Sequence, residues 1–251
     1  MHDGRTRRPA ARTGGLTQVA RSSARSAASA PRFALPPLVP FVGDTLEADH
    51  DYERQDIVGL DLAGRDGTDA RFLECRFARC GLDGAVLRRV RVIESLLEDV
   101  HATTVDLGDS SWRDSEIAGG RLGAVTLAGA TWSGVRVRGS KVDFLSVAGA
   151  TLEDVVFERC EVGGFDARGA RLHAVRFVDC TVDEVNVSGA TLAKVDLSGA
   201  RLRSLIGVES LRGAILGRQQ LLDLAPLLAA ELGIQVRADR SGEALESPSE
   251  V

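Results

Sequence analysis

Cysteine is the residue type in this chain that most directly suggests chemistry. Its thiol can serve as a metal ligand, a nucleophile or half of a disulfide. The four cysteines are Cys75, Cys80, Cys160 and Cys180. They include no Cys-x-x-Cys pair, and no histidine follows their spacing, so the sequence does not support a zinc site. We therefore expect free thiols that pack as small apolar side chains.

The remaining candidates for catalysis are also isolated from one another. The histidines are His2, His50, His101 and His173, and none has a serine or cysteine at a spacing that would make a nucleophile. No glycine-rich phosphate-binding motif occurs. We accordingly predict no catalytic, cofactor-binding or metal-binding residues, and a protein that is not an enzyme.

Composition sets the class of protein. The chain has 251 residues, with 31 Lys and Arg against 36 Asp and Glu, and 44% of its residues are hydrophobic but only 4% aromatic. Such a chain can bury a core, which must be built from small and branched side chains. No apolar run reaches the ~18 residues that span a bilayer. We expect a cytoplasmic protein without a membrane segment.

Charge and composition divide the chain into a middle and two ends. Residues 1–33 are rich in Arg, Ala, Ser and Thr, which predicts a disordered basic tail. The tail is either inert or an arm for nucleic acid, and elsewhere we do not expect direct nucleic-acid binding. Residues 34–56, with several prolines, are predicted to form an N-terminal cap that lies irregularly across the first coil. Residues 237–251 are predicted to be a flexible tail.

Residues 57–206 carry a repeat of five residues. Every fifth residue from Ile57 to Leu202 gives 30 positions, of which 27 are large and apolar and none is charged. A second series of small residues lies two positions earlier, so the unit reads small–x–large–x–x. This period matches neither a helix nor a strand. It indicates a chain that turns a corner every five residues.

A longer period, equal to four of these units, supports a square coil. Gly-Ala-Thr-Trp at 129–132 recurs as Gly-Ala-Thr-Leu at 149–152 and again at 189–192. Units such as Ala190-Thr191-Leu192 resemble those of the pentapeptide-repeat family. The resemblance implies an all-β solenoid, a right-handed quadrilateral β-helix of about 7.5 coils with a C-terminal helical cap, roughly 36 Å long at ~4.8 Å per coil.

The four-unit period also predicts which core side chains meet. Trp112 should stack on Trp132, and Phe157 on Phe177. Phe165 occupies a small position beside a small partner, Ala167, which predicts an exchange of sizes. The unit at 65–67 has the wrong residues at both inward positions, so we expect an irregular first coil. Cys160 and Cys180 lie one coil apart, where a disulfide is the alternative to free thiols.

Residues 207–236 are predicted to form the C-terminal cap. Pro226 is expected to kink this helix or to begin a second one, and Gly233 to end it. The stretch 221–234 resembles the cap of bacterial pentapeptide-repeat proteins. Its leucines either cover the last coil or form a homodimer contact; they are Leu221, Leu224, Leu228 and Leu232.

Function is expected on the outer faces of the coil. The first hypothesis is a protein–protein interaction scaffold with an unknown partner. It rests on outward apolar residues, chiefly Leu73, Val86, Ile93, Leu96 and Phe144. The alternative follows from the resemblance: some pentapeptide-repeat proteins, the quinolone-resistance members among them, bind DNA gyrase and topoisomerase IV by imitating duplex DNA. No face here is continuously acidic, which weakens that alternative.

Overall fold

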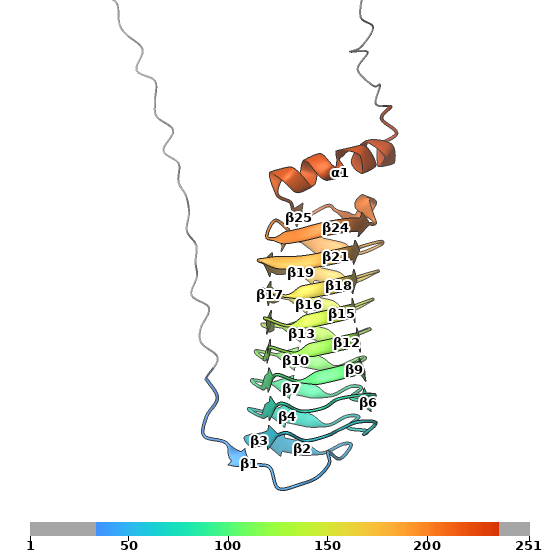
Figure 1. Cartoon of the computed structure of the whole chain (residues 1–251). Helices are drawn as coiled ribbons and strands as arrows, with labels where there is room; N and C mark the ends of the chain where they lie inside the picture. Colours follow the sequence, from blue (N-terminus) through green and yellow to red (C-terminus); the bar gives the residue numbers. More distant parts are fainter. Residues whose placement is uncertain (1–33, 236–251) are drawn as a thin grey trace, which may run out of the picture. The chain divides into compact units, whose positions relative to one another are not determined.

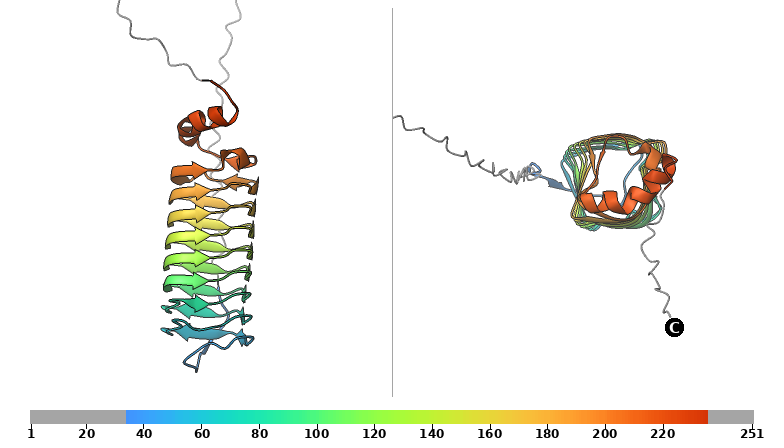
Figure 2. Two further views of the ribbon diagram at one scale, coloured as in Figure 1. Left: turned by 90° about the vertical axis from the view of Figure 1, so that its right-hand side faces the viewer. Right: turned by 90° about the horizontal axis from the view of Figure 1, so that it is seen from above.

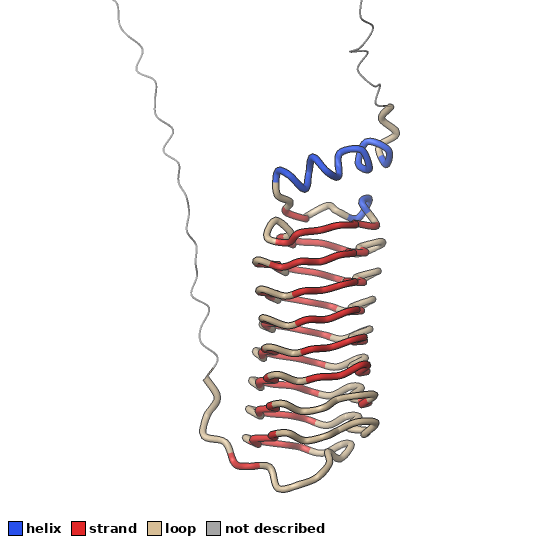
Figure 3. Tube along the Cα trace, viewed as in Figure 1, coloured by secondary structure: helices blue, strands red, loops and turns tan. Residues whose placement is uncertain are grey.

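Residues 34–235 of the computed structural model are described, and they form a right-handed β-helix that ends in one α-helix. The two predicted tails, 1–33 and 237–251, lie outside the described residues. The strands stack in parallel (Figures 1 and 3), and a view along the axis shows the four-sided outline of the coils (Figure 2). The predicted solenoid is confirmed.

Three sides of each coil form parallel sheets, and the fourth side consists mainly of turns. Sheet 1 contains β1 (Val39–Pro40), β3 (Gln55–Val58), β5 (Arg76–Ala78), β8 (Leu96–Glu98), β11 (Glu116–Ala118), β14 (Arg136–Arg138), β17 (Val156–Glu158), β20 (Arg176–Val178), β23 (Val195–Asp196) and β25 (Ala214–Ile215). Sheet 2 contains β2 (Asp51–Glu53), β4 (Arg71–Leu73), β7 (Arg91–Ile93), β10 (Ser111–Arg113), β13 (Thr131–Ser133), β16 (Thr151–Glu153), β19 (Arg171–His173) and β22 (Thr191–Ala193). Sheet 3 contains β6 (Ala85–Val86), β9 (His101–Asp106), β12 (Arg121–Thr126), β15 (Lys141–Ser146), β18 (Glu161–Asp166), β21 (Cys180–Asn186) and β24 (Ala200–Ile206). A 3₁₀ turn, η1 (Val208–Ser210), and the helix α1 (Arg218–Glu231) complete the fold.

Main-chain hydrogen bonds hold successive coils in register, so that each residue lies opposite its equivalent four units later. Trp112 lies opposite Trp132, and the N–H of Thr131 donates to the carbonyl of Ser110 in the coil before it (2.8 Å). Most corners contain a residue in the left-handed conformation, for example Glu94 with φ 47° and Gly129 with φ 69°. Many glycines of the sequence occupy such corners, because this conformation costs glycine least.

The β-helix is longer than the predicted 7.5 coils. It has about nine, because β2 and β25 extend the sheets to either side of residues 57–206. Tyr52 in β2 continues the inward column of Phe72 with nearly parallel rings 5.1 Å apart, although its segment was predicted to belong to the cap. A tyrosine with a polar hydroxyl does not look like a core residue from sequence alone. Here the hydroxyl accepts a hydrogen bond from the N–H of Glu47 (2.7 Å).

The first coil is irregular, as predicted. Residues 61–66 make only isolated bridges to the next coil instead of a strand of sheet 3. Leu87 fills the space beside Gly67, where a Cβ would come within 2.8 Å of it. Leu46 lies next to the same position and is almost fully buried. Leu46 therefore closes the N-terminal end of the core, while β1 adds a short strand to the edge of sheet 1.

The predicted aromatic columns are partly confirmed. Phe157 and Phe177 stack with their centroids 4.8 Å apart and their planes at 8°. Phe165 packs edge-on against both and is buried. This confirms the prediction that a large side chain here is accommodated by the small Ala167 two residues later. The stacking predicted for Trp112 and Trp132 is wrong, since their planes meet at 43°.

The two indoles differ in their hydrogen bonds. Nε1 of Trp112 donates to the hydroxyl of Ser110, two residues earlier (3.1 Å). The same position before Trp132 is Ala130, and the buried Nε1 of Trp132 has no partner. The identity of one small inward residue thus decides whether an indole N–H is satisfied, which the five-residue pattern does not reveal.

This difference gives a reciprocal test of stability. Ala130→Ser supplies the missing acceptor and should raise the free energy of unfolding by about 1 kcal/mol, whereas Ser110→Ala should lower it by about as much. Urea unfolding of both variants measures the effect. Equal changes of the same sign in the two variants would contradict this explanation.

Candidate interaction surfaces

The outer faces of the coil are lined by columns of side chains, to which each coil contributes one equivalent residue. In sheet 1 one such column contains Asp56, Arg76, Leu96, Glu116 and Arg136. Because neighbouring members lie about 4.8 Å apart, each outward side chain meets the equivalent side chain of the next coil. The charge and polarity of each outer face therefore depend on which residues share a column.

Many acidic side chains are paired with arginines of neighbouring coils. Arg76 reaches both Asp56 (3.1 Å) and Glu98 (2.7 Å). On the turn side, Arg88 likewise contacts Asp106 (3.1 Å) and Asp109 (2.7 Å). Such pairs neutralise the acids locally and leave little extended negative potential.

Two of these pairs also affect the ionisation of the acid. A hydrogen bond from Arg89 lowers the pKa of Asp69, and one from Arg168 lowers the pKa of Asp166. Asp166 is itself largely buried, with its carboxylate 2.8 Å from the guanidinium. Both acids stay charged at neutral pH, but each has its own counter-ion.

The predicted apolar surface residues fall on three faces instead of one. Leu73 and Ile93 are neighbours in sheet 2, Leu96 begins a strand of sheet 1, and Val86 and Phe144 belong to sheet 3. Val86 and Phe144 are exposed, and the other three are half-buried. The structure therefore does not gather all five into a single patch.

Phe144 is the exposed aromatic residue of sheet 3. Its ring is 44% exposed and lies against Gly164 of the next coil, where a Cβ would come within 2.7 Å of the ring. Gly164 thus lets the ring lie on the sheet surface. Phe144 therefore gives this face one exposed apolar position.

At the C-terminal end, Gln220 attaches α1 to the last coils. Its Nε2 donates to the carbonyls of Leu197 and Ala200 (both 2.8 Å), and its Oε1 accepts from the N–H of Gly217 (2.7 Å). In an earlier coil the carbonyl of Cys160, in the same column as Ala200, accepts a main-chain N–H from Thr181 (2.9 Å). The side chain of Gln220 therefore supplies the hydrogen-bond donor that the main chain of a further coil would otherwise provide. Sequence analysis did not identify this residue.

The four predicted cap leucines have different environments. Leu224 is buried and Leu228 is half-buried, whereas Leu221 and Leu232 are 50% and 74% exposed. Three further apolar side chains of this end, not singled out from the sequence, are at least half exposed: Leu222, Leu227 and Ile234. Covering of the last coil is therefore the interpretation for Leu224 and Leu228. A homodimer contact stays a prediction for the exposed Leu221 and Leu232.

The helix α1 runs across the end of the coil (Figure 2), and an open groove of about 200 Å³ lies between it and β24. Pro226 lies inside this one continuous helix, so the expectation that it begins a second helix is wrong. Gly233 ends the helix with φ 69°, and the N–H groups of Gly233 and Ile234 donate to Ala230 and Ala229. This is a Schellman motif, which confirms the predicted end of the helix.

The cysteines lie in the core of the β-helix. All four are buried free thiols, so the alternative of a disulfide between Cys160 and Cys180 is not adopted. Burial raises the pKa of Cys75 and of Cys80, which makes both poor nucleophiles. Within residues 34–235, no cluster of three potential metal ligands occurs, and no helix is long and apolar enough to cross a membrane.

Comparison with known proteins agrees with this architecture. The family model for pentapeptide repeats matches residues 170–204 in eight copies. Residues 170–204 therefore carry pentapeptide repeats of this family. A comparison with curated proteins finds no match.

Several solved structures resemble this chain in part. HetL from the cyanobacterium Nostoc, involved in the regulation of heterocyst differentiation, is 17% identical, with 67% of this chain and 90% of HetL covered and a TM-score of 0.30. QnrB1, a plasmid-mediated fluoroquinolone resistance protein, is 19% identical in one trypsin-treated form, with 75% and 99% covered and a TM-score of 0.28. Its full-length form is 15% identical, with 73% and 100% covered and a TM-score of 0.24. Similarity at this level transfers no residue roles to the present chain.

The role of Gln220 is testable. Gln220→Ala leaves two carbonyls without a donor and should weaken the attachment of α1 by about 1–3 kcal/mol. Gln219→Ala is the matched control, since Gln219 bonds only to the exposed Asp223 (2.9 Å) and its loss should cost under about 0.5 kcal/mol. Amide hydrogen exchange along α1 reports both. Equally protected helices in the two variants would show that Gln220 does not hold the cap.

Proposed function

We propose that this pentapeptide-repeat protein is a non-enzymatic protein–protein interaction scaffold, acting in the cytoplasm. The observation that carries the proposal is the apolar surface of the C-terminal cap. Leu221, Leu222, Leu232 and Ile234 are each at least half exposed on one short segment. Clustered apolar side chains of this kind are costly in water and are typical of surfaces that bind protein.

The faces of the β-helix support the same function in a different way. Their charges are largely paired within the chain, so long-range attraction contributes little to recognition. Recognition would then depend on shape and on apolar contacts, for which Phe144 on sheet 3 and the pair Leu73–Ile93 on sheet 2 are the proposed positions.

A second copy of the chain is the proposed partner at the cap. Two-fold pairing would cover the exposed leucines of both copies, and each fully buried leucine contributes about 1.5–3 kcal/mol. We expect a dimer in solution, which Leu221→Asp combined with Leu222→Asp converts to a monomer. Neither residue lines the groove beside β24, so the fold should survive both changes. Light scattering over a range of concentrations measures the mass.

The matched control is Gln219→Asp, which adds a charge at an exposed polar position of the same helix. It should leave the dimer intact. If the unaltered protein is a monomer at every concentration, dimerisation through the cap is excluded, and the apolar surface must serve a different protein.

The alternative function is a DNA mimic that binds gyrase or topoisomerase IV. Glu74, Glu94 and Asp114 favour it, because they form a column of acids along one corner of successive coils. Glu74 and Asp114, however, are already paired with Arg54 (2.7 Å) and Arg113 (3.9 Å). A mimic would need a charge density close to that of DNA phosphates.

A supercoiling assay separates the two functions. We expect the purified protein at micromolar concentration to leave gyrase activity unchanged at low salt. Inhibition that weakens as salt increases would instead support the DNA mimic, because electrostatic binding is screened by salt.

A further inference from the structure

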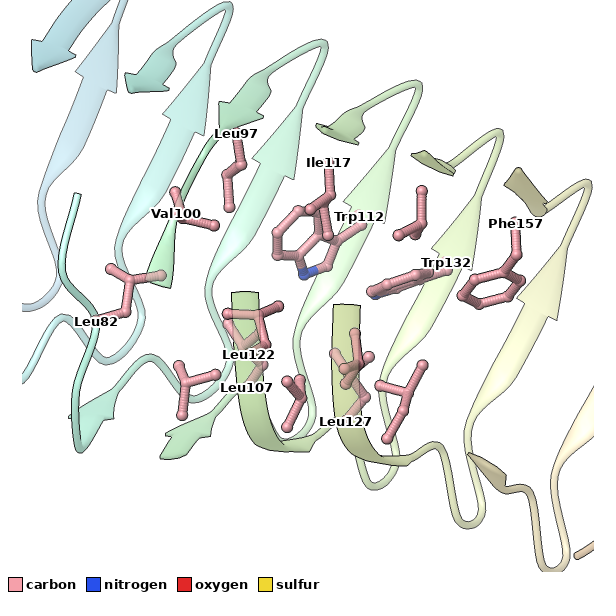
Figure 4. A pocket seen from close by; sticks show the side chains of 15 residues that line it. Leu82, Leu97, Val100, Leu107, Trp112, Ile117, Leu122, Leu127, Trp132 and Phe157 are labelled. Atoms are coloured by element: carbon pink, nitrogen blue, oxygen red, sulfur yellow. The ribbon is translucent and has the colours of Figure 1, made fainter. Parts of the chain in front are cut away.

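The interior of the β-helix contains empty space in its first half. Two cavities, of about 40 and 30 Å³, lie along the axis, and four side chains line both of them. Their linings contain only apolar residues. Figure 4 shows the larger cavity, into which side chains from several successive coils point, Trp112 and Trp132 among them. The four shared residues are Leu82, Leu97, Leu107 and Trp112.

The sequence explains why the space occurs here. Ala102 occupies an inward position for large residues, between Leu82 and Leu122, and the latter two line the larger cavity. The tilt of 43° between the two indoles prevents the close stacking that fills the core farther along. In those later coils Phe165 adds a third ring beside the stacked pair.

Accessibility of the inward side chains shows the same contrast. Leu97 and Leu107, which line the cavities, keep 9% and 7% of their solvent-accessible surface. Val155 and Val182 in the later coils keep none. The early core is thus looser than the late core.

We propose that the larger cavity is a binding site for one small apolar molecule, of the class of dioxygen, xenon or a hydrocarbon of one to three carbons. Water is a poor occupant, because it needs two to four polar partners and this lining offers none. An apolar guest instead restores the dispersion contacts that the lining side chains lose in an empty space. The volume exceeds the ~10–15 Å³ that one water molecule needs and is far below the ~150 Å³ that admits benzene, which limits the guest to a few heavy atoms. This site goes beyond the proposed scaffold function, since it lies inside the coil.

The chain contains its own probes for this site. Its two tryptophans, Trp112 and Trp132, both line the larger cavity and are almost fully buried. Xenon is an apolar heavy-atom quencher of indole fluorescence, whereas iodide and acrylamide are polar. We expect xenon at increasing pressure to quench the full-length protein with a saturating curve. Its initial slope should be at least about fivefold that of iodide, because polar quenchers reach a buried indole only through local opening.

A larger side chain at Ala102, which lies between two lining residues of the same column, is the decisive variant. Ala102→Val and Ala102→Leu should reduce xenon quenching stepwise while iodide quenching stays low. Valine is tolerated in this column, since Val142, Val162 and Val182 occupy it in later coils. Val182→Ile is the matched control, because it enlarges the same column away from the cavity and should leave xenon quenching unchanged.

Two results would overturn the proposal. One is xenon quenching that is no stronger than iodide quenching in the unaltered protein. The other is a folded Ala102→Val protein, verified by circular dichroism, in which xenon quenching keeps its original strength. Neither result bears on the cap or on the scaffold function.

Discussion

The main-chain ladder that holds each coil in register with the next is the interaction on which the rest of this structure depends. Every coil donates hydrogen bonds to its neighbours at a fixed register, as Thr131 does to Ser110 and Thr151 to Ala130. A shift of one residue would exchange inward and outward side chains along the whole coil. The ladder therefore forces each position to stack on its equivalent, inside and outside the core.

This stacking has opposite consequences for core and surface. Inside, similar residues meet, and the column of Phe157 and Phe177 packs closely. Outside, like charges repel at this spacing, and several columns place arginine beside acid, as at Arg76 and Asp56. The long faces are thus largely self-neutralised. The two ends, where the ladder stops, require separate solutions: Leu46 and β1 at the beginning, Gln220 and α1 at the end. Both ends leave apolar side chains uncovered, and the end formed by α1 exposes the larger group, with four leucines and Ile234 against Val39 and Val42 at the beginning.

The sequence predicts most of the coil, because period and residue size determine it directly. The register, the buried cysteines, the packing of Phe165 and the helix end at Gly233 all follow from spacing. Details that depend on individual hydrogen bonds do not. The bond of Trp112 to Ser110, the burial of Tyr52 and the side-chain bonds of Gln220 depend on individual partners that no periodic pattern reveals. The apolar surface residues could be recognised as outward-facing. Their distribution over three sheets depends on which side of the square each position occupies.

The most direct test of the ladder is a distance that increases with the number of coils. Spin labels at Ser111 and Thr191 belong to one exposed column of sheet 2, four coils apart, and a second pair at Asp51 and Thr191 is seven coils apart. At ~4.8 Å per coil, pulsed electron paramagnetic resonance should give narrow distributions near about 19 and about 34 Å. Distances that do not increase in proportion to the number of coils, or broad distributions for both pairs, would contradict the stacked β-helix.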